Sequence, residues 1–144
     1  MKMLLDAATL AAALQGRLPV AMQLARRRPA EVAVSRLALA QVEIGLRARP
    51  RAAALYQTRF EDFRDSLRVH DFGPAEAEQA VRLGAQLQLS GETLPAIALI
   101  DAATALAHHC CLVSAEPERF RWVAGLQCTS WLRPASPGST LEST

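Results

Sequence analysis

The chain lacks the features that mark several large classes of protein. Its longest stretch without a charged residue, from Ala102 to Ala115, has 14 residues, fewer than the ~20 that an α-helix needs to cross a membrane. A secretory leader is not expected, because Asp6 interrupts the first apolar run. Three cysteines form no even set for a disulfide framework and favour a reduced, cytoplasmic protein. The net charge of +2 is too small to indicate a strong nucleic-acid-binding protein by itself.

Alanine and leucine are the most abundant residues, 28 and 21 of the 144, and this composition favours helices over an all-β fold. A hydrophobic fraction of 51% is enough for one compact core. Fifteen arginines stand against one lysine, and asparagine is absent. This bias is typical of a GC-rich genome, so the arginine count alone is not taken as a sign of function. We expect one domain over residues 1–133 and a disordered tail, rich in Pro, Ser, Thr and Gly, over 134–144.

Short apolar or β-branched runs alternate with segments of helical spacing. Strands are predicted at 1–6, 32–35, 67–72, 110–114 and 126–132. Helices are predicted at 7–15, 19–27, 37–47, 51–66, 75–89 and 95–108, with a single turn at 117–121. This alternation indicates an α/β fold with a central parallel sheet of about five strands, flanked by helices on both faces. Ligands of such sheets bind beyond the carboxyl ends of the strands, where Asp6, Ser35 and residues 114–116 are expected to lie.

The order and spacing of several short motifs resemble the PIN-domain family, most closely the VapC-type toxins of bacterial toxin–antitoxin pairs. The resemblance extends over residues 1–133. Its motifs are Leu4-Leu5-Asp6, Val34-Ser35, Ile44-Gly45, Ala102-Ala103-Thr104-Ala105, Leu112-Val113-Ser114, Phe120 and Val123-Ala124-Gly125-Leu126.

The resemblance implies a metal-dependent endoribonuclease, whose carboxylates hold Mg²⁺ or Mn²⁺, cations that prefer oxygen ligands. The metal activates a water molecule and stabilises charge on the phosphate that is cleaved. The resemblance further implies a homodimer and a VapB-like antitoxin whose tail lies across the site. RNA is the implied substrate of an active member, and no membrane is involved.

The family's acidic positions are poorly matched. Asp6 corresponds to the first acid, but the second position, four residues before Gly45, holds Gln41. The third position holds Ala98, and Glu116 stands where the family has Asp or Asn. Ala7 and Ala8 also depart from the family pattern, so natural divergence explains the set better than deliberate silencing of a nuclease.

Two neighbouring acids could replace the missing ones. Glu43 lies two residues from Gln41, ~200° around the helix, and is better placed to pair with Arg47 at i+4. Gln41 itself is expected on an apolar face with Leu37, Ala40 and Ile44.

Asp101 is the stronger replacement, since it lies one turn beyond Ala98 and ~60° from it in an otherwise apolar helix. A carboxylate there needs a partner, a metal or water, because an unpaired buried charge is unfavourable. The alternative is that Asp101 faces solvent or an arginine.

The candidate catalytic and metal-binding residues are therefore Asp6, Asp101 and Glu116. Each also has a structural interpretation: Asp6 could accept hydrogen bonds from loop amides, and Glu116 could be a solvated loop acid. No residues for an organic cofactor are predicted.

Other motifs are weaker. The run from His108 to Cys111 contains metal-binding residue types, but adjacent residues diverge, whereas zinc ligands are spaced by two or more residues. His70 is interpreted as a strand-edge residue rather than a catalytic base. The arginines at 26–28 and 47–51 could contact RNA phosphates or could be solvated helix ends.

Two functions follow. The first is a VapC-like toxin with weakened or lost Mg²⁺- or Mn²⁺-dependent endoribonuclease activity. The alternative is a catalytically inactive PIN fold without a metal, which acts as a module that binds an antitoxin or another protein. The two share a fold and differ in metal binding.

Overall fold

A computed structural model describes residues 1–133, and the predicted tail at 134–144 lies outside the described residues. Five parallel strands form one sheet in the order β3-β2-β1-β4-β5. The strands are β1 (Met3–Leu5), β2 (Val32–Ser35), β3 (Arg68–His70), β4 (Cys111–Val113) and β5 (Cys128–Thr129). The predicted α/β class and the five-stranded sheet are confirmed. The second strand has its predicted bounds, whereas the other four are shorter than predicted, most clearly β5, of which only two residues pair with β4.

The helices lie close to their predicted positions. They are α1 (Ala7–Leu14), α2 (Leu18–Ala25), α3 (Arg36–Arg47), α4 (Pro50–Ser66), α5 (Pro74–Leu89) and α6 (Ala96–Ala107), with short 3-10 helices η1 (Pro29–Glu31) and η2 (Pro117–Phe120). Three of the six α-helices have proline in their first turn, where its missing N–H has no helical partner to lose. Within the described residues, no helix is long and apolar enough to cross a membrane.

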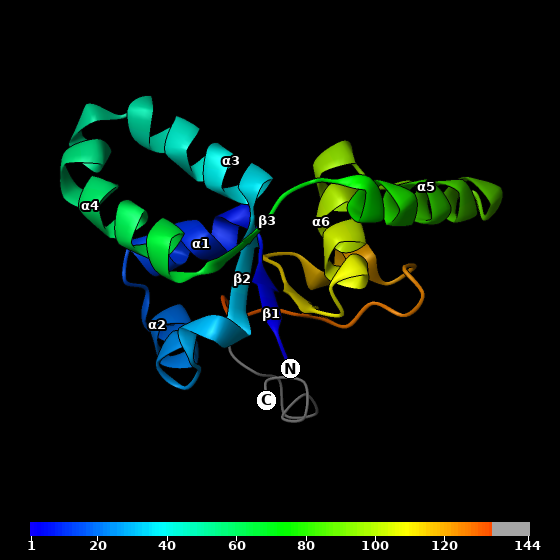
Figure 1. Ribbon diagram of the computed structural model, residues 1–144, viewed down its shortest axis with the longest axis horizontal. Helices are drawn as coiled ribbons and strands as arrows, with labels where there is room; N and C mark the ends of the chain where they lie inside the picture. Colours follow the sequence, from blue (N-terminus) through cyan, green and yellow to red (C-terminus); the bar gives the residue numbers. More distant parts are fainter. Residues whose placement is uncertain (134–144) are drawn as a thin grey trace.

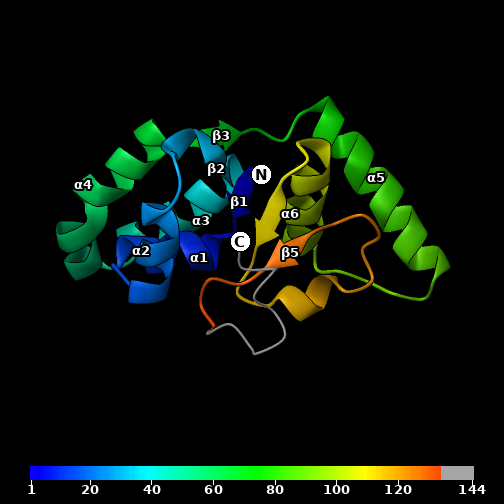
Figure 2. The ribbon, with the colours of Figure 1, turned by 90° about the horizontal axis from the view of Figure 1, so that it is seen from below.

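Helices cover both faces of the sheet, α1 to α4 on one side and α5 with α6 on the other (Figures 1 and 2). The alternation of side chains along each strand produces two cores. Met3 and Leu5 pack with the first group of helices, whereas Leu4 packs with the second. We call these the α1–α4 face and the α5–α6 face.

The buried side of α3 differs from the prediction. Ile44 is 68% exposed and Ala40 is also exposed, so the predicted apolar face of this helix is wrong. The buried residues of α3 are Ala38, Leu39, Val42 and Leu46. The reason is that α3 packs against both α1 and α4, and the side that meets these two helices decides which residues are buried.

Candidate functional site

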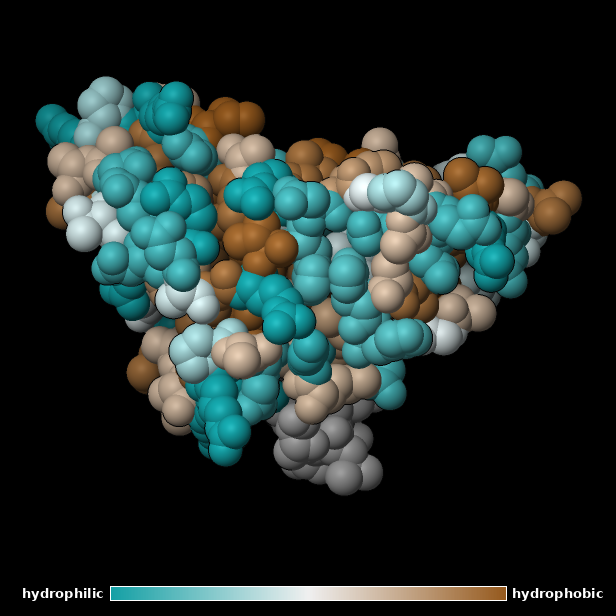
Figure 3. All heavy atoms as spheres, in the orientation of Figure 1, coloured by the Kyte–Doolittle hydropathy of each residue, from teal (hydrophilic) through white to brown (hydrophobic). Residues whose placement is uncertain are grey.

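The carboxyl ends of three neighbouring strands meet at one edge of the sheet and carry Asp6, Ser35 and Ser114, as predicted. In the register of the sheet, Leu5 of β1 lies beside Val34 of β2 and Val113 of β4, which brings the residues after them to the same edge. The outline of the molecule is indented there, between α3 and the α5–α6 pair (Figure 3).

Asp6 links two elements at this edge. Its Oδ1 accepts a hydrogen bond from the backbone N–H of Thr9 at 2.8 Å and so caps α1. Its Oδ2 accepts one from the N–H of Ala115 at 3.0 Å, in the loop after β4. These contacts are the structural role that the sequence left open. A carboxylate has about four acceptor positions, so two bonds leave room for a further ligand.

Asp101 lies on α6 beside Asp6 and is buried, with 7% of its surface exposed. Burial, and then the negative charge of Asp6, raise the pKa of the Asp101 carboxyl to about 7. None of the described residues donates a hydrogen bond to it. The structure thus brings together two of the three candidate acids, and one of them is about half protonated at neutral pH.

Glu116 does not join this pair. Its side chain is 54% exposed and forms an ion pair with Arg119, while its backbone N–H donates to Ser114 Oγ at 3.0 Å. Glu43 pairs with Arg47 at 2.7 Å, as predicted. Across residues 1–133, no group of three or more His, Cys, Asp or Glu side chains is arranged to hold a metal ion.

The donor set therefore does not match a complete site for a divalent cation. The two carboxylates of Asp6 and Asp101 are suitable oxygen ligands for Mg²⁺ or Mn²⁺. The adjacent family positions supply a neutral amide at Gln41 and a buried methyl group at Ala98, and Glu116 is held by an arginine. Because affinity for such cations depends on the number of charged ligands, this pair is a weak site at most.

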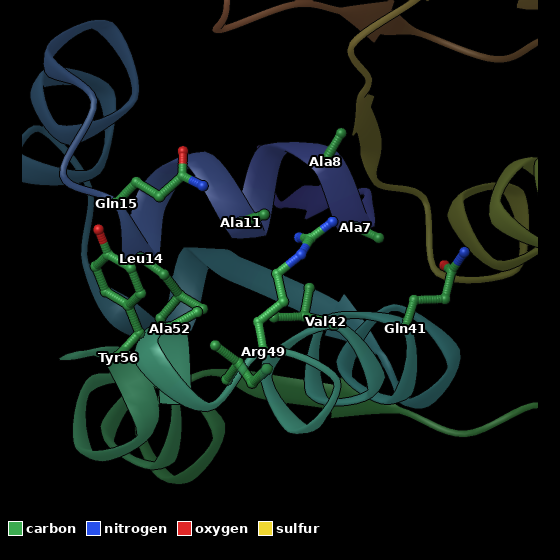
Figure 4. A pocket seen from close by; sticks show the side chains of 12 residues that line it. Ala7, Ala8, Ala11, Leu14, Gln15, Gln41, Val42, Arg49, Ala52 and Tyr56 are labelled. Atoms are coloured by element: carbon green, nitrogen blue, oxygen red, sulfur yellow. The ribbon is translucent and has the colours of Figure 1, made fainter. Parts of the chain in front are cut away.

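A pocket of about 300 Å³ lies between α1, α3 and α4 (Figure 4). It begins at Ala7 and Ala8, which directly follow Asp6 in the chain. Small and apolar residues make up most of its wall, and Gln15, Gln41 and Tyr56 contribute polar groups. The lining residues are Ala7, Ala8, Ala11, Leu14, Gln15, Gln41, Val42, Gly45, Leu46, Arg49, Ala52 and Tyr56.

Arg49 is the one charged residue of this lining. It stands between α3 and α4, and its guanidinium points across the pocket toward Ala7 at the start of α1 (Figure 4). No acidic side chain within residues 1–133 forms an ion pair with it. The pocket thus combines an apolar wall with a single available positive charge.

Sequence reasoning missed this pocket and the role of Arg49 within it. The signal available was the helix break at Pro50, which places Arg49 at the junction of two helices. It also missed Glu76, which is buried between α5 and α6 and hydrogen-bonded to His108. The spacing from Gly73 to Glu76 is that of a capping box and could have indicated that Glu76 folds back onto the start of α5.

Comparison with known proteins supports the fold. The PIN domain family model matches residues 3–126. The structure of VapBC2 from Rickettsia felis bound to a promoter DNA fragment is similar, with a TM-score of 0.79 and 19% identity over 91% of this chain and 99% of that chain. FitAcB from Neisseria gonorrhoeae gives a TM-score of 0.80 and 16% identity over 92% of this chain and 99% of that chain. DNA-bound VapBC from Salmonella typhimurium gives a TM-score of 0.79 and 18% identity over 91% of this chain and 98% of that chain. No curated protein matches the sequence.

Proposed function

Because the chain belongs to the PIN domain family, we propose that it is the toxin-like member of a cytoplasmic toxin–antitoxin pair, with weakened or lost endoribonuclease activity. Several of the structures that resemble it are toxin–antitoxin complexes. The observation that carries the proposal is the reduced acid cluster, in which Asp6 meets Asp101 while Glu116 pairs with Arg119.

The protonation of the acid pair supports weak activity. A divalent cation binds carboxylates in their charged form, but burial and Asp6 keep the pKa of Asp101 at about 7. At neutral pH a cation would have to displace a proton from about half of the molecules. Metal binding, and any RNA cleavage that depends on it, should therefore strengthen as the pH rises from 6 to 8.

The test is cleavage of a mixed RNA substrate by the purified protein with Mg²⁺, Mn²⁺ or EDTA. We expect slow or undetectable cleavage by the native chain. The double variant Gln41→Glu, Ala98→Asp restores the family's two missing acids and should raise metal-dependent cleavage by at least tenfold. Mn²⁺ binding measured by calorimetry should rise in parallel.

Matched controls separate the acid pair from the fold. Asp6→Asn retains an oxygen that can cap α1, and Asp101→Asn retains side-chain volume; both should abolish any metal-dependent cleavage. Glu43→Gln removes a solvated acid of α3 and should change nothing. Robust Mg²⁺-dependent cleavage by the native chain, lost in both asparagine variants, would disprove weakened activity and establish a working nuclease.

We propose that the pocket between α1, α3 and α4 receives the tail of a VapB-like antitoxin. Its wall is mainly apolar and begins at Ala7 and Ala8, which follow Asp6 in the chain, so a segment bound there would extend toward Asp6. Arg49 adds a positive charge that would favour a carboxylate on this segment. Arg49→Glu should weaken binding of the cognate antitoxin by tenfold or more, whereas Arg51→Glu, which lies outside the pocket lining, should have a small effect.

The same pocket favours the second candidate function, a binding module without catalysis. If the double acid variant gains neither metal binding nor cleavage while Arg49→Glu still weakens antitoxin binding, this second function is correct.

We further propose that the protein is a homodimer, as its family resemblance implies; light scattering would show a mass near 31 kDa, roughly twice the 15.6 kDa of the chain.

A further inference from the structure

A compact polar cluster joins β3, α5 and the end of α6, none of which lines the pocket described above. The imidazole rings of His70 and His108 are stacked, with centroids 3.7 Å apart and an interplanar angle of 15°. Nε2 of His108 lies 3.1 Å from Oε2 of Glu76. His70 ends the edge strand β3, Glu76 is in the first turn of α5, and His108 follows α6. Three elements thus meet through three titratable side chains.

Glu76 supplies the negative charge of the cluster. It is buried, with 6% of its surface exposed, and its Oε1 accepts a hydrogen bond from the backbone N–H of Gly73 at 3.0 Å. Burial opposes ionisation of Glu76, but hydrogen bonds from the backbone and from His108 outweigh it, so its pKa lies below the usual value. One buried carboxylate can balance one imidazolium ion, and His108 is the ring in hydrogen-bond contact with it.

His70 has no comparable partner. Its Nε2 is buried and makes no hydrogen bond within the described chain. Burial, then the neighbouring His108 and Arg68, lower the pKa of His70, and Lys2 adds to this, while Glu76 partly opposes it. Asp71, the other acid nearby, is paired with Arg36 at 2.7 Å. A second proton in the cluster would place two positive charges on stacked rings beside only one unshared carboxylate.

We propose that the stacked His70–His108 pair is a pH-sensitive latch, which holds the start of α5 against β3 while His70 is neutral and releases it when His70 takes a proton. The latch follows from the geometry of the cluster: two aromatic rings in contact, one acid, and an orphaned ring nitrogen. Outside the latch, α5 packs chiefly against α6. Beyond the three-residue link at 71–73, the Glu76–His108 hydrogen bond and the stacked rings are what join its first turn to the end of β3.

The direction in which pH changes the opening of the latch follows from the pKa of His70. A histidine whose pKa is lower in the closed state binds its proton more readily once the latch opens. Opening is therefore favoured as the pH falls below the ordinary histidine value of about 6.5, by up to tenfold per pH unit. Above that pH the latch is closed.

Amide hydrogen exchange of the full-length protein tests the proposal. Between pH 7.5 and 5.0, after correction for intrinsic exchange rates, protection of the first two turns of α5 should fall about tenfold, while α4 should keep its protection. His70→Phe preserves a stacked ring but cannot take a proton. In this variant the protection of the first two turns of α5 should fall less than twofold over the same pH range. His109→Asn removes an exposed histidine in a left-handed conformation that asparagine tolerates, and it should behave as the native protein.

Two results would overturn the latch. One is an equal loss of α5 protection in the native protein and in His70→Phe; the other is a His70 imidazole that titrates above pH 6.5 by NMR. Should His70→Phe fail to fold, His108→Gln serves in its place, because glutamine can still donate to Glu76 while one titratable ring is removed. Between pH 7.5 and 5.0 its α5 protection should fall less than that of the native protein, because burial still lowers the pKa of His70 but the second ring no longer adds to it; an equal fall would overturn the latch.

Discussion

The two faces of the sheet bury different kinds of side chain. The α1–α4 face buries the large side chains of Phe60 and Trp131 together with leucines and valines. The α5–α6 face has a smaller core with several alanines, and both buried acids of the described chain, Glu76 and Asp101, lie on this side. One face therefore supplies most of the apolar burial, whereas the other holds the groups whose charge depends on pH.

The two faces are therefore expected to contribute differently to the stability of this small domain, one through apolar burial and the other through groups that titrate. Apolar burial is nearly independent of pH, so the α1–α4 face should stabilise the fold equally in mild acid and mild base. A buried carboxyl with a raised pKa and a half-buried histidine with a lowered one both make stability depend on pH. We expect this dependence to originate on the α5–α6 face.

The largest expected effect is at the centre of the α1–α4 face. Phe60→Ala should lower the free energy of unfolding by about 3–5 kcal/mol, because Phe60 is fully buried between the helices and the sheet. Leu87→Ala, on the α5–α6 face, should cost about 2–3 kcal/mol, since α5 is an outer helix that can relax into the space. Urea unfolding at pH 7 measures both, and a larger loss for Leu87→Ala would reverse the comparison.

The second-largest effect is expected for Asp101→Asn, which should stabilise the fold to an extent that depends on pH. Unfolding restores the ordinary pKa of Asp101, near 3.8, from its folded value of about 7. Stability is therefore lost as the pH rises from about 4 to 7, and the loss is complete above 7. Asp101→Asn should recover about 1–3 kcal/mol at pH 8, after the penalty for burying an unpaired amide.

At pH 5 the same substitution should give a smaller gain, because only the part of the loss between about pH 4 and pH 5 has then occurred. Urea unfolding at the two pH values measures the difference. An Asp101→Asn variant that is less stable than the native protein at both would show that the carboxylate has a partner in solution, and added Mn²⁺ would then be the first partner to test.

The smallest effect concerns a surface contact on the α1–α4 face. Glu43 and Arg47 pair across one turn of α3, with Arg47 largely exposed. Glu43→Ala should change the free energy of unfolding by at most about 0.5 kcal/mol. A thermal shift of about a degree or two would fit, whereas a loss above 1 kcal/mol would mean that this pair contributes more than an exposed ion pair ordinarily does.

Much of the fold was predictable from the sequence because its signals are local. Short apolar runs between helical segments define a parallel α/β sheet, and proline marks where α2, α4 and α5 begin. The pairing of Glu43 with Arg47 was also local, since i+4 spacing brings the two side chains together on a helix.

The candidate site was predictable only in part. A single acid in an apolar helix indicated that Asp101 needed a partner, and the end of a strand placed Asp6 at the sheet edge. The ion pair of Glu116 with Arg119 competes with the predicted cluster, and nothing in the loop sequence decides between them. The stacking of His70 on His108 joins residues from different elements, and no local pattern reports such a contact.

The position of β4 in the sheet has a consequence for the order in which the protein folds. This strand is the fourth along the chain, yet it pairs with β1, and the loop after it donates to Asp6 from 109 residues away. During synthesis, β1, β2 and the first four helices leave the ribosome well before α6 and β4. The pocket can therefore form early, whereas Asp6 and Asp101 meet only when the last third of the chain docks. A nascent chain would offer a partner its pocket before it possesses its acid pair.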